Sequence, residues 1–155
     1  MVDAAYRIPG RDQLYIWSGR QYARIEFNQG TPAQAPQTSA SSVDTVVPVP
    51  DHKDQLYVFF GGRYLKIKID DNLNDTSVNS GARTIPSGWK SLEKAGFDTV
   101  DAAVVVPGTA NQLYFFPGLE GWPNLVEAGF YGVDAIVESP GGGDVYYVFR
   151  GGQVC

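Results

Sequence analysis

The sequence predicts an all-β protein that forms a single domain from four related segments of short strands, with a few short helices. Three observations carry this prediction. The chain has 155 residues, which suits one domain, and 43% of them are hydrophobic, which is enough for a core. Gly, Tyr and Phe are all frequent, as is typical of many strands joined by tight turns. One motif also recurs four times along the chain.

The recurring motif begins with a Val-Asp pair and continues, after a turn, into an aromatic strand. In the four copies, the aligned tyrosine follows the aspartate by 12, 13, 13 and 13 residues, a register that chance would not hold. The distance from one aspartate to the next varies more, at 41, 57 and 33 residues, so insertions fall after the second strand. The domain 1–155 therefore divides into the repeats 1–42, 43–98, 99–131 and 132–155.

Strands can be placed within each repeat. A first strand starts at the aspartate, and a turn rich in Pro, Gly and Asp leads into the second strand. The second strands are apolar on both faces, which predicts burial on both sides within a stack of sheets. They cover residues 13–17, 55–59, 112–116 and 145–149. Third strands at 22–27 and 64–69 alternate apolar and polar residues, as expected of half-exposed outer strands.

Two repeats end with a Gly-Trp pair that predicts a short helix. Trp89 is followed by Leu92, and Trp122 is followed by Leu125. Residues three apart lie on one face of a helix, so each pair can face the core together. The Gly that stands four residues after each Leu is a natural end for the helix.

Three of the repeats look incomplete. Residues 28–42 replace the Gly-Trp segment of the first repeat with a run rich in Pro, Ser, Gln and Ala, which predicts a flexible loop or linker. The third repeat has no recognisable third strand, and the fourth stops at Cys155, where its third strand should begin. Missing outer strands leave exposed sheet edges, through which a homodimer could form. Cys155 is the lone cysteine, and its role stays open between pairing with another chain and no role.

The Val-Asp-Ala-Ala start, the Gln-Leu-Tyr strand with its following Gly, and the Gly-Trp-x-x-Leu segment together resemble the hemopexin repeat. The form is similar to that of plant albumin-2-like and fungal hemopexin-fold proteins. This resemblance covers nearly the whole chain apart from residues 28–42. It implies a four-bladed hemopexin-like β-propeller with incomplete blades 1, 3 and 4, in which the first strand of each blade lines a central tunnel.

The resemblance also implies a cation site in the tunnel, because backbone carbonyls near the start of the first strands commonly hold an ion there. Oxygen ligands suit calcium or sodium. The carbonyls would come from Asp3, Asp44, Asp101 and Asp134, and from Ala5, Val46, Ala103 and Ile136 two residues further on. The aspartate side chains are expected chiefly to accept hydrogen bonds from backbone N–H groups at the strand ends.

The charge of the chain narrows its partners. A net charge of −5 and a pI of about 4.7 argue against nucleic acid and slightly favour cationic ligands such as polyamines. No apolar run approaches the length of a membrane span, so no membrane partner is expected. The repeat begins directly after Met1, which leaves no room for a signal peptide, so a soluble, cytoplasmic protein is expected, with an extracellular location as the alternative.

The chain carries no recognisable catalytic motif, so it is not expected to be an enzyme. His52 is the only histidine and lies in a predicted surface turn, so haem, which some relatives bind, is a weak expectation. Residues 70–75 resemble the start of a calcium loop. However, Asp75 stands where that loop needs Gly, and Gly81 stands where it needs Glu.

The sequence therefore predicts a non-catalytic hemopexin-like binding module with an axial cation site. Its further ligand would be a small molecule of the polyamine or haem class, or a protein. One alternative is a structural or storage-like albumin without a dedicated ligand, and another is a truncated propeller. Whether the repeats converge on one tunnel would distinguish a binding module from an open arc.

Overall fold

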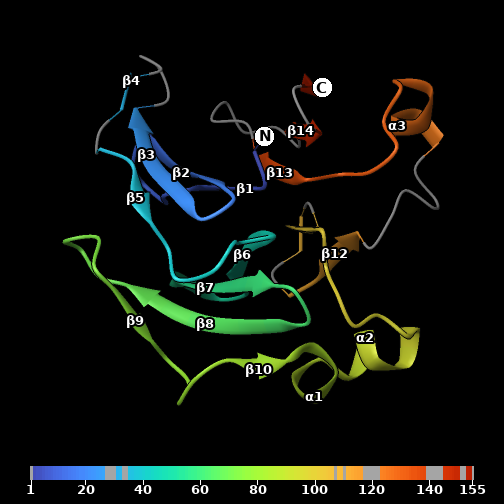
Figure 1. Cartoon of the computed structure of the whole chain (residues 1–155), viewed down its shortest axis with the longest axis horizontal. Helices are drawn as coiled ribbons and strands as arrows, with labels where there is room; N and C mark the ends of the chain where they lie inside the picture. Colours follow the sequence, from blue (N-terminus) through green and yellow to red (C-terminus); the bar gives the residue numbers. More distant parts are fainter. Residues whose placement is uncertain are drawn as a thin grey trace.

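The computed structural model places four antiparallel β-sheets, one for each repeat, and three short helices within the residues that it describes (Figure 1). These residues are 2–26, 31–32, 35–106, 108–109, 111–116, 123–138, 145–150 and 153–154. The prediction of an all-β protein with a few short helices is confirmed. None of the four sheets closes on itself within this part of the chain.

The first sheet contains β1 (Ala4–Arg7), β2 (Gln13–Ser18) and β3 (Gln21–Glu26) in sequence order, each antiparallel to the next. Two further strands, β4 (Thr31–Pro32) and β5 (Gln37–Thr38), both pair with β3. The expectation that this segment is only a flexible linker was therefore wrong for these residues, because their backbone groups extend the sheet at the free edge of β3.

The second sheet is formed by the longest stretch of sequence, residues 45–84. It comprises β6 (Thr45–Val49), β7 (His52–Phe60) and β8 (Arg63–Ile69), each antiparallel to the next. Two short strands, β9 (Asp75–Ser77) and β10 (Arg83–Thr84), pair with β8. The predicted second and third strands of this repeat are confirmed.

The third and fourth sheets are smaller. The described residues of the third repeat form β11 (Ala102–Val105) and β12 (Leu113–Phe116). Those of the fourth form β13 (Ala135–Glu138), β14 (Tyr146–Arg150) and β15 (Gln153–Val154). The fourth repeat thus contains a short third strand that we had not expected. Cys155 lies outside the described residues.

The four repeats share one pairing register, which explains the regular spacing in the sequence. A small residue near the start of each first strand stands opposite a large aromatic residue of the second strand. The pairs are Ala4 with Trp17, Thr45 with Phe59, Ala102 with Phe116, and Ala135 with Phe149. In every repeat, the backbone N–H of the aspartate that opens the motif donates a hydrogen bond to the carbonyl of that aromatic residue, over 2.9 to 3.1 Å.

Helices follow the second and third sheets at the predicted places. Helix α1 (Ile85–Gly88) leads into α2 (Lys90–Ala95), and α3 (Pro123–Glu127) occupies the third repeat. Trp89 lies at the junction of α1 and α2 rather than inside a helix, which corrects the expectation of one continuous helix. Gly96 ends α2 in the left-handed conformation, as predicted. Trp122 is outside the described residues.

The first strands of the four sheets lie against one another in the interior. Strand β1 contacts β6 and β13, and β11 contacts the same two strands, so the first repeat lies beside the last (Figure 1). Three apolar cores fill the spaces between successive sheets, from the first sheet to the fourth. Large rings such as Phe59 and Phe116 are fully buried in these cores.

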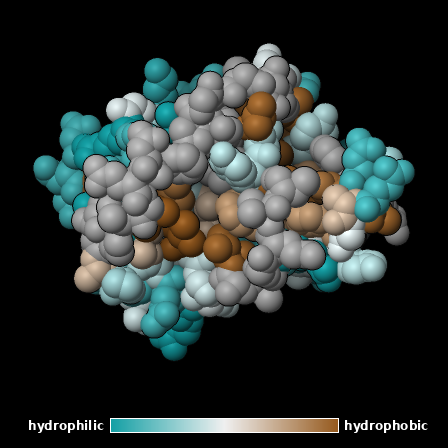
Figure 2. All heavy atoms as spheres, turned by 90° about the horizontal axis from the view of Figure 1, so that it is seen from above, coloured by the Kyte–Doolittle hydropathy of each residue, from teal (hydrophilic) through white to brown (hydrophobic). Residues whose placement is uncertain are grey.

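Apolar side chains also reach the surface of the molecule. In the face shown in Figure 2, hydrophobic side chains gather in a hollow toward the middle, and hydrophilic side chains lie toward the margins. No helix in the described residues has the length and apolar character that a membrane crossing requires. The expected cytoplasmic location stays a prediction.

Candidate functional site

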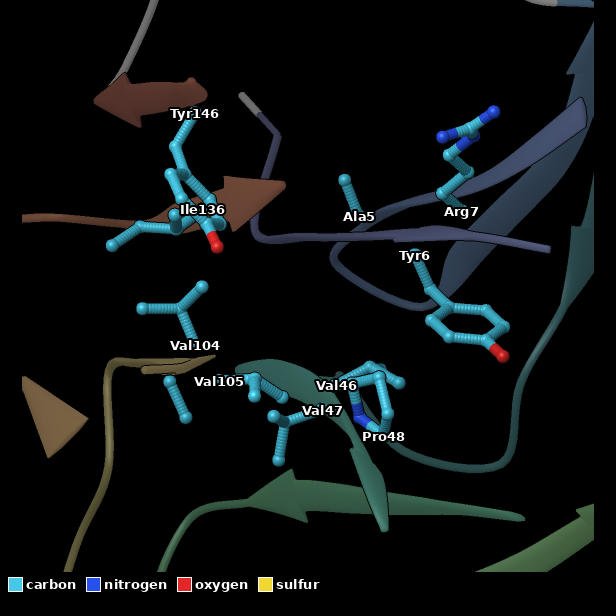
Figure 3. A pocket seen from close by; sticks show the side chains of 11 residues that line it. Ala5, Tyr6, Arg7, Val46, Val47, Pro48, Val104, Val105, Ile136 and Tyr146 are labelled. Carbon is cyan, nitrogen blue, oxygen red and sulfur yellow. The ribbon is translucent and has the colours of Figure 1, made fainter. Parts of the chain in front are cut away.

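A cavity of about 100 Å³ lies where the four first strands meet. It is lined by one residue from the same position of each repeat, and these are the four non-aspartate positions that the sequence predicted for the axis (Figure 3). They are Ala5, Val46, Ala103 and Ile136, and all four are buried. The structure thus brings together residues that are up to 131 positions apart in the sequence.

Strand pairing fixes the direction of the backbone polar groups at this cavity. The N–H of Ile8 donates to the carbonyl of Gln13, and hydrogen-bonded pairs alternate with non-hydrogen-bonded pairs along an antiparallel ladder. By this alternation Ala5 stands in a non-hydrogen-bonded pair, so its N–H and C=O point away from β2. In the third sheet, the N–H of Val106 donates to the carbonyl of Gln112, and the same alternation places Ala103 in a non-hydrogen-bonded pair.

In each repeat, the predicted aspartate stands two residues before the residue that lines the cavity, just ahead of the first strand. The carboxylate of Asp3 accepts a hydrogen bond from the N–H of Gly19, and that of Asp44 accepts one from the N–H of Gly61. These bonds tie the start of a first strand to the turn after the second strand. The expected capping role of the side chains is therefore confirmed for these two residues.

The aspartates are close enough to influence one another's ionisation. Burial raises the pKa of the Asp44 carboxyl, the hydrogen bond from Gly61 opposes that rise, and the charge of Asp3 adds to it. Burial also raises the pKa of Asp101, and the charges of Asp44 and Asp134 raise it further. Negative charge from all four repeats therefore gathers at one end of the cavity.

The remaining residues that line the cavity are mainly aliphatic, and β1 and β14 add polar side chains. Figure 3 shows Ala5 and Arg7 on one side of β1 and Tyr6 on the other, as strand alternation requires. Arg7 lines the cavity, whereas none of the four aspartates is among its described lining residues. Tyr146 from β14 also lines it.

Side chains alone do not form a metal centre in the described residues, because no three His, Cys, Asp or Glu groups come close enough together to hold an ion. His52 is exposed at the start of β7 and does not line this cavity. In the 70–75 loop, the Asp70 carboxylate accepts hydrogen bonds from the N–H groups of Asn72 and Asn74 and from the Asn74 amide. These bonds lower the pKa of Asp70, and the loop between β8 and β9 also accepts a hydrogen bond from the Arg11 guanidinium at the Asp71 carbonyl.

Thr45 is the residue at this site that the sequence reasoning missed. It is buried, and its hydroxyl accepts a hydrogen bond from the N–H of Ala103 over 3.2 Å, which links the second sheet to the third. The aligned positions of the other repeats hold Ala4, Ala102 and Ala135. A lone hydroxyl in an otherwise alanine position was a signal that the repeat alignment already contained.

Comparison with known proteins supports the predicted resemblance. No protein-family model matches the chain. Over 105 residues the chain is 27% identical to Albumin-2 of Pisum sativum, and the match covers 59% of this chain. It covers 45% of Albumin-2, so the chain spans just under half the length of the curated relative that it matches.

Two solved plant structures share the fold. A crystal structure of a hemopexin fold protein from cow pea superposes with a TM-score of 0.84 at 19% identity, covering 99% of this chain and 84% of that one. A plant lectin with two metal binding sites, from Cicer arietinum, gives a TM-score of 0.77 at 16% identity with the same coverage. The expected similarity to albumin-2-like and hemopexin-fold proteins is thus confirmed at the level of the fold.

Proposed function

We propose that the chain is a non-catalytic binding protein with a four-bladed hemopexin-type propeller fold, and that it holds a small cation on the axis between its first strands. The ion would be calcium or sodium. The observation that supports this most directly is the cavity lined by Ala5, Val46, Ala103 and Ile136, one equivalent residue from each repeat.

The donor set suits a hard cation. By the pairing register, the carbonyls of Ala5 and Ala103 point away from the second strands, and the equivalent pairing extends this to the other two repeats. A buried carbonyl normally finds a partner, and a cation with its waters would supply one. The cavity, at about 100 Å³, exceeds the roughly 30 Å³ that one water occupies.

The charge distribution favours the same kind of ligand. Burial raises the pKa of the Asp44 and Asp101 carboxyls, the charges of neighbouring aspartates raise it further, and a cation near them would relieve that repulsion. The net charge of −5 acts in the same direction, so polyamines are a second class of ligand that fits. Haem fits less well, because the single histidine is exposed and away from the axis.

The named relatives divide between two functions. The lectin with two metal binding sites favours a binding protein that carries metal. The similarity to Albumin-2 favours the alternative of a storage-like albumin without a dedicated ligand. The two functions differ in whether a specific ion stays with the folded chain.

Native mass spectrometry of the whole chain, with calcium, with sodium or with a chelator, tests the cation site. We expect one ion per chain, and calcium should be lost when the chelator is added. The Asp44→Asn, Asp101→Asn double variant should bind calcium several-fold more weakly, because it removes two nearby negative charges. The Asp98→Asn, Glu127→Gln double variant is the matched control, since it removes two exposed carboxylates elsewhere.

A compact chain that retains no ion under any of these conditions would refute the axial site and favour the storage-like alternative. Equal weakening by the control variant would show that only the overall charge matters.

A further inference from the structure

A second cavity lies between the first and second sheets. It encloses about 410 Å³, and apolar side chains of β2 and β3 face those of β7 and β8 across it. The first sheet contributes three aromatic rings, from Tyr15, Trp17 and Tyr22. Leu56, Val58 and Ile67 are among the residues on the other side. The serine-rich stretch 38–42 forms part of the rim.

The same place between the second and third sheets is filled by the chain itself. There the ring centroid of Trp89 lies 4.8 Å from that of Tyr57 and 5.9 Å from that of Tyr64, both on the second sheet. Its other neighbours are Phe59 at 5.7 Å and, on the third sheet, Phe115 at 5.3 Å.

The first-sheet wall of this space matches the second-sheet wall around Trp89. Trp17 pairs with Tyr22 in the first sheet as Phe59 pairs with Tyr64 in the second. The three rings of the first sheet lie 5.7 to 6.3 Å from one another, in a spacing like that of Tyr57, Phe59 and Tyr64. They therefore form the same aromatic platform.

The opposite wall has a smaller side chain at one position, although the Phe60 ring also lines it. Val58 pairs with Val46 as Phe115 pairs with Ala103, so Val58 stands where Phe115 stands in the next interface. The first repeat also has no counterpart of Trp89, because residues 28–42, which replace the Gly-Trp segment, contain no aromatic residue. Among the described residues, an aromatic platform without a counterpart of Trp89 is thus left between the first two sheets.

We propose that this cavity binds a small planar aromatic molecule of about indole size, held between the first and second sheets as Trp89 is held between the second and third. The volume lies within the range of roughly 300–1,000 Å³ that small-molecule pockets occupy. Stacked or edge-on rings add to the burial of apolar surface. This site is separate from the axial cavity and does not depend on a cation there.

The rim indicates which aromatic molecules are preferred. Asp75 is the only charged residue among those described as lining the cavity. Its charge also raises the pKa of Tyr22, after the larger effect of burial, so it acts close to the platform. A neutral or cationic aromatic ligand is therefore favoured over an anionic one.

Calorimetric titration of the whole chain with indole, tryptamine and indole-3-acetate tests the proposal, and cyclohexanol serves as a non-aromatic probe. We expect one site per chain for indole and tryptamine, weaker binding of indole-3-acetate, and the weakest binding of cyclohexanol. Val58→Phe introduces the ring that Phe115 presents to Trp89 at the equivalent position of the third sheet, so it should tighten indole binding several-fold. Val78→Phe makes the same change at an exposed position outside the cavity and should leave binding unchanged.

Trp89→Ala supplies a second measurement. It should open a matching space in the next interface and raise the indole stoichiometry from one to two; if this variant fails to fold, the Val58→Phe and Val78→Phe pair still decides. The proposal is overturned if the parent chain binds no indole up to its solubility limit. It is also overturned if Val58→Phe binds indole no more tightly than the parent, or if folded Trp89→Ala gains no second site.

Discussion

At the scale of single residues, the aspartates that open each repeat act in two opposed ways. Asp3 and Asp44 accept backbone hydrogen bonds that tie two strand ends together. Burial and mutual repulsion nevertheless raise the pKa of Asp44 and Asp101, so their charged forms are disfavoured in the folded chain. A motif that orders the backbone thus also concentrates charge that costs stability when no cation is bound.

The pKa of Asp101 leads to a pH-dependent prediction. Because its pKa in the folded chain lies above that in the unfolded chain, stability from protonation is complete below the unfolded pKa of about 3.9 and is lost as the pH rises through the folded value. Asp101→Asn should therefore raise the free energy of unfolding at pH 7, by less than about 1 kcal/mol because exposed charges are screened.

Urea unfolding of the parent and Asp101→Asn at low salt, at pH 7 and at pH 3.5, measures this effect. The gain should vanish at the lower pH. A gain of the same size at both pH values would mean that charge is not its cause. The expected fall at higher salt offers an independent check.

At the scale of elements, the Gly-Trp segment shows how a short helix depends on the strand that it covers. Gly88 ends α1 directly against the ring of Tyr64, and a Cβ at this position would overlap the hydroxyl and ring edge of that tyrosine. Glycine is therefore required by close approach rather than by backbone conformation. The motif could be recognised in the sequence, whereas the reason for its glycine could not, because Tyr64 lies in an earlier strand.

Gly88→Ala should lower the free energy of unfolding by about 1–3 kcal/mol, as overpacking of a core typically does. Gly132→Ala is the matched control, because the nearest atom to its added Cβ is the Arg150 Nε at 4.0 Å. Chemical denaturation of both variants provides the comparison. If the two lose the same stability, the contact with Tyr64 is not what requires glycine at position 88.

At the scale of the whole molecule, stability depends on contacts between repeats. Each first strand contacts the first strands of two other repeats, and the three apolar cores lie between sheets rather than within them. No repeat can bury its apolar faces alone, which favours cooperative unfolding. The homodimer expected from the incomplete repeats stays a prediction, which sedimentation of the whole chain would test.

Cooperative unfolding can be tested with a substitution in the last repeat. Val133 is 3% exposed, and Val133→Ala should lower the stability by roughly 1–3 kcal/mol. Amide hydrogen exchange in β2 and β7, far along the chain, should lose protection by the same free energy. Val126→Ala, at a residue that is 51% exposed, should leave both strands unchanged. Loss of protection confined to β13 and β14 would contradict a single cooperative unit.

The sequence by itself determined the recurring motif and most of its strands and turns, whereas the positions at the axis were predicted only through the resemblance to the hemopexin repeat. It could do so because strand alternation, turn residues and register are local patterns that recur with the same spacing. The short strands β4 and β5 were missed because their pairing with β3 compensates for weak strand propensity.

Only the tertiary structure decided how residues from different repeats combine. The hydrogen bond from Ala103 to Thr45, the packing of Trp89 on Phe115, and the aromatic platform left without a tryptophan all join segments distant in the chain. No local pattern encodes such contacts, because they depend on which sheet lies beside which and on how much space each interface leaves to be filled.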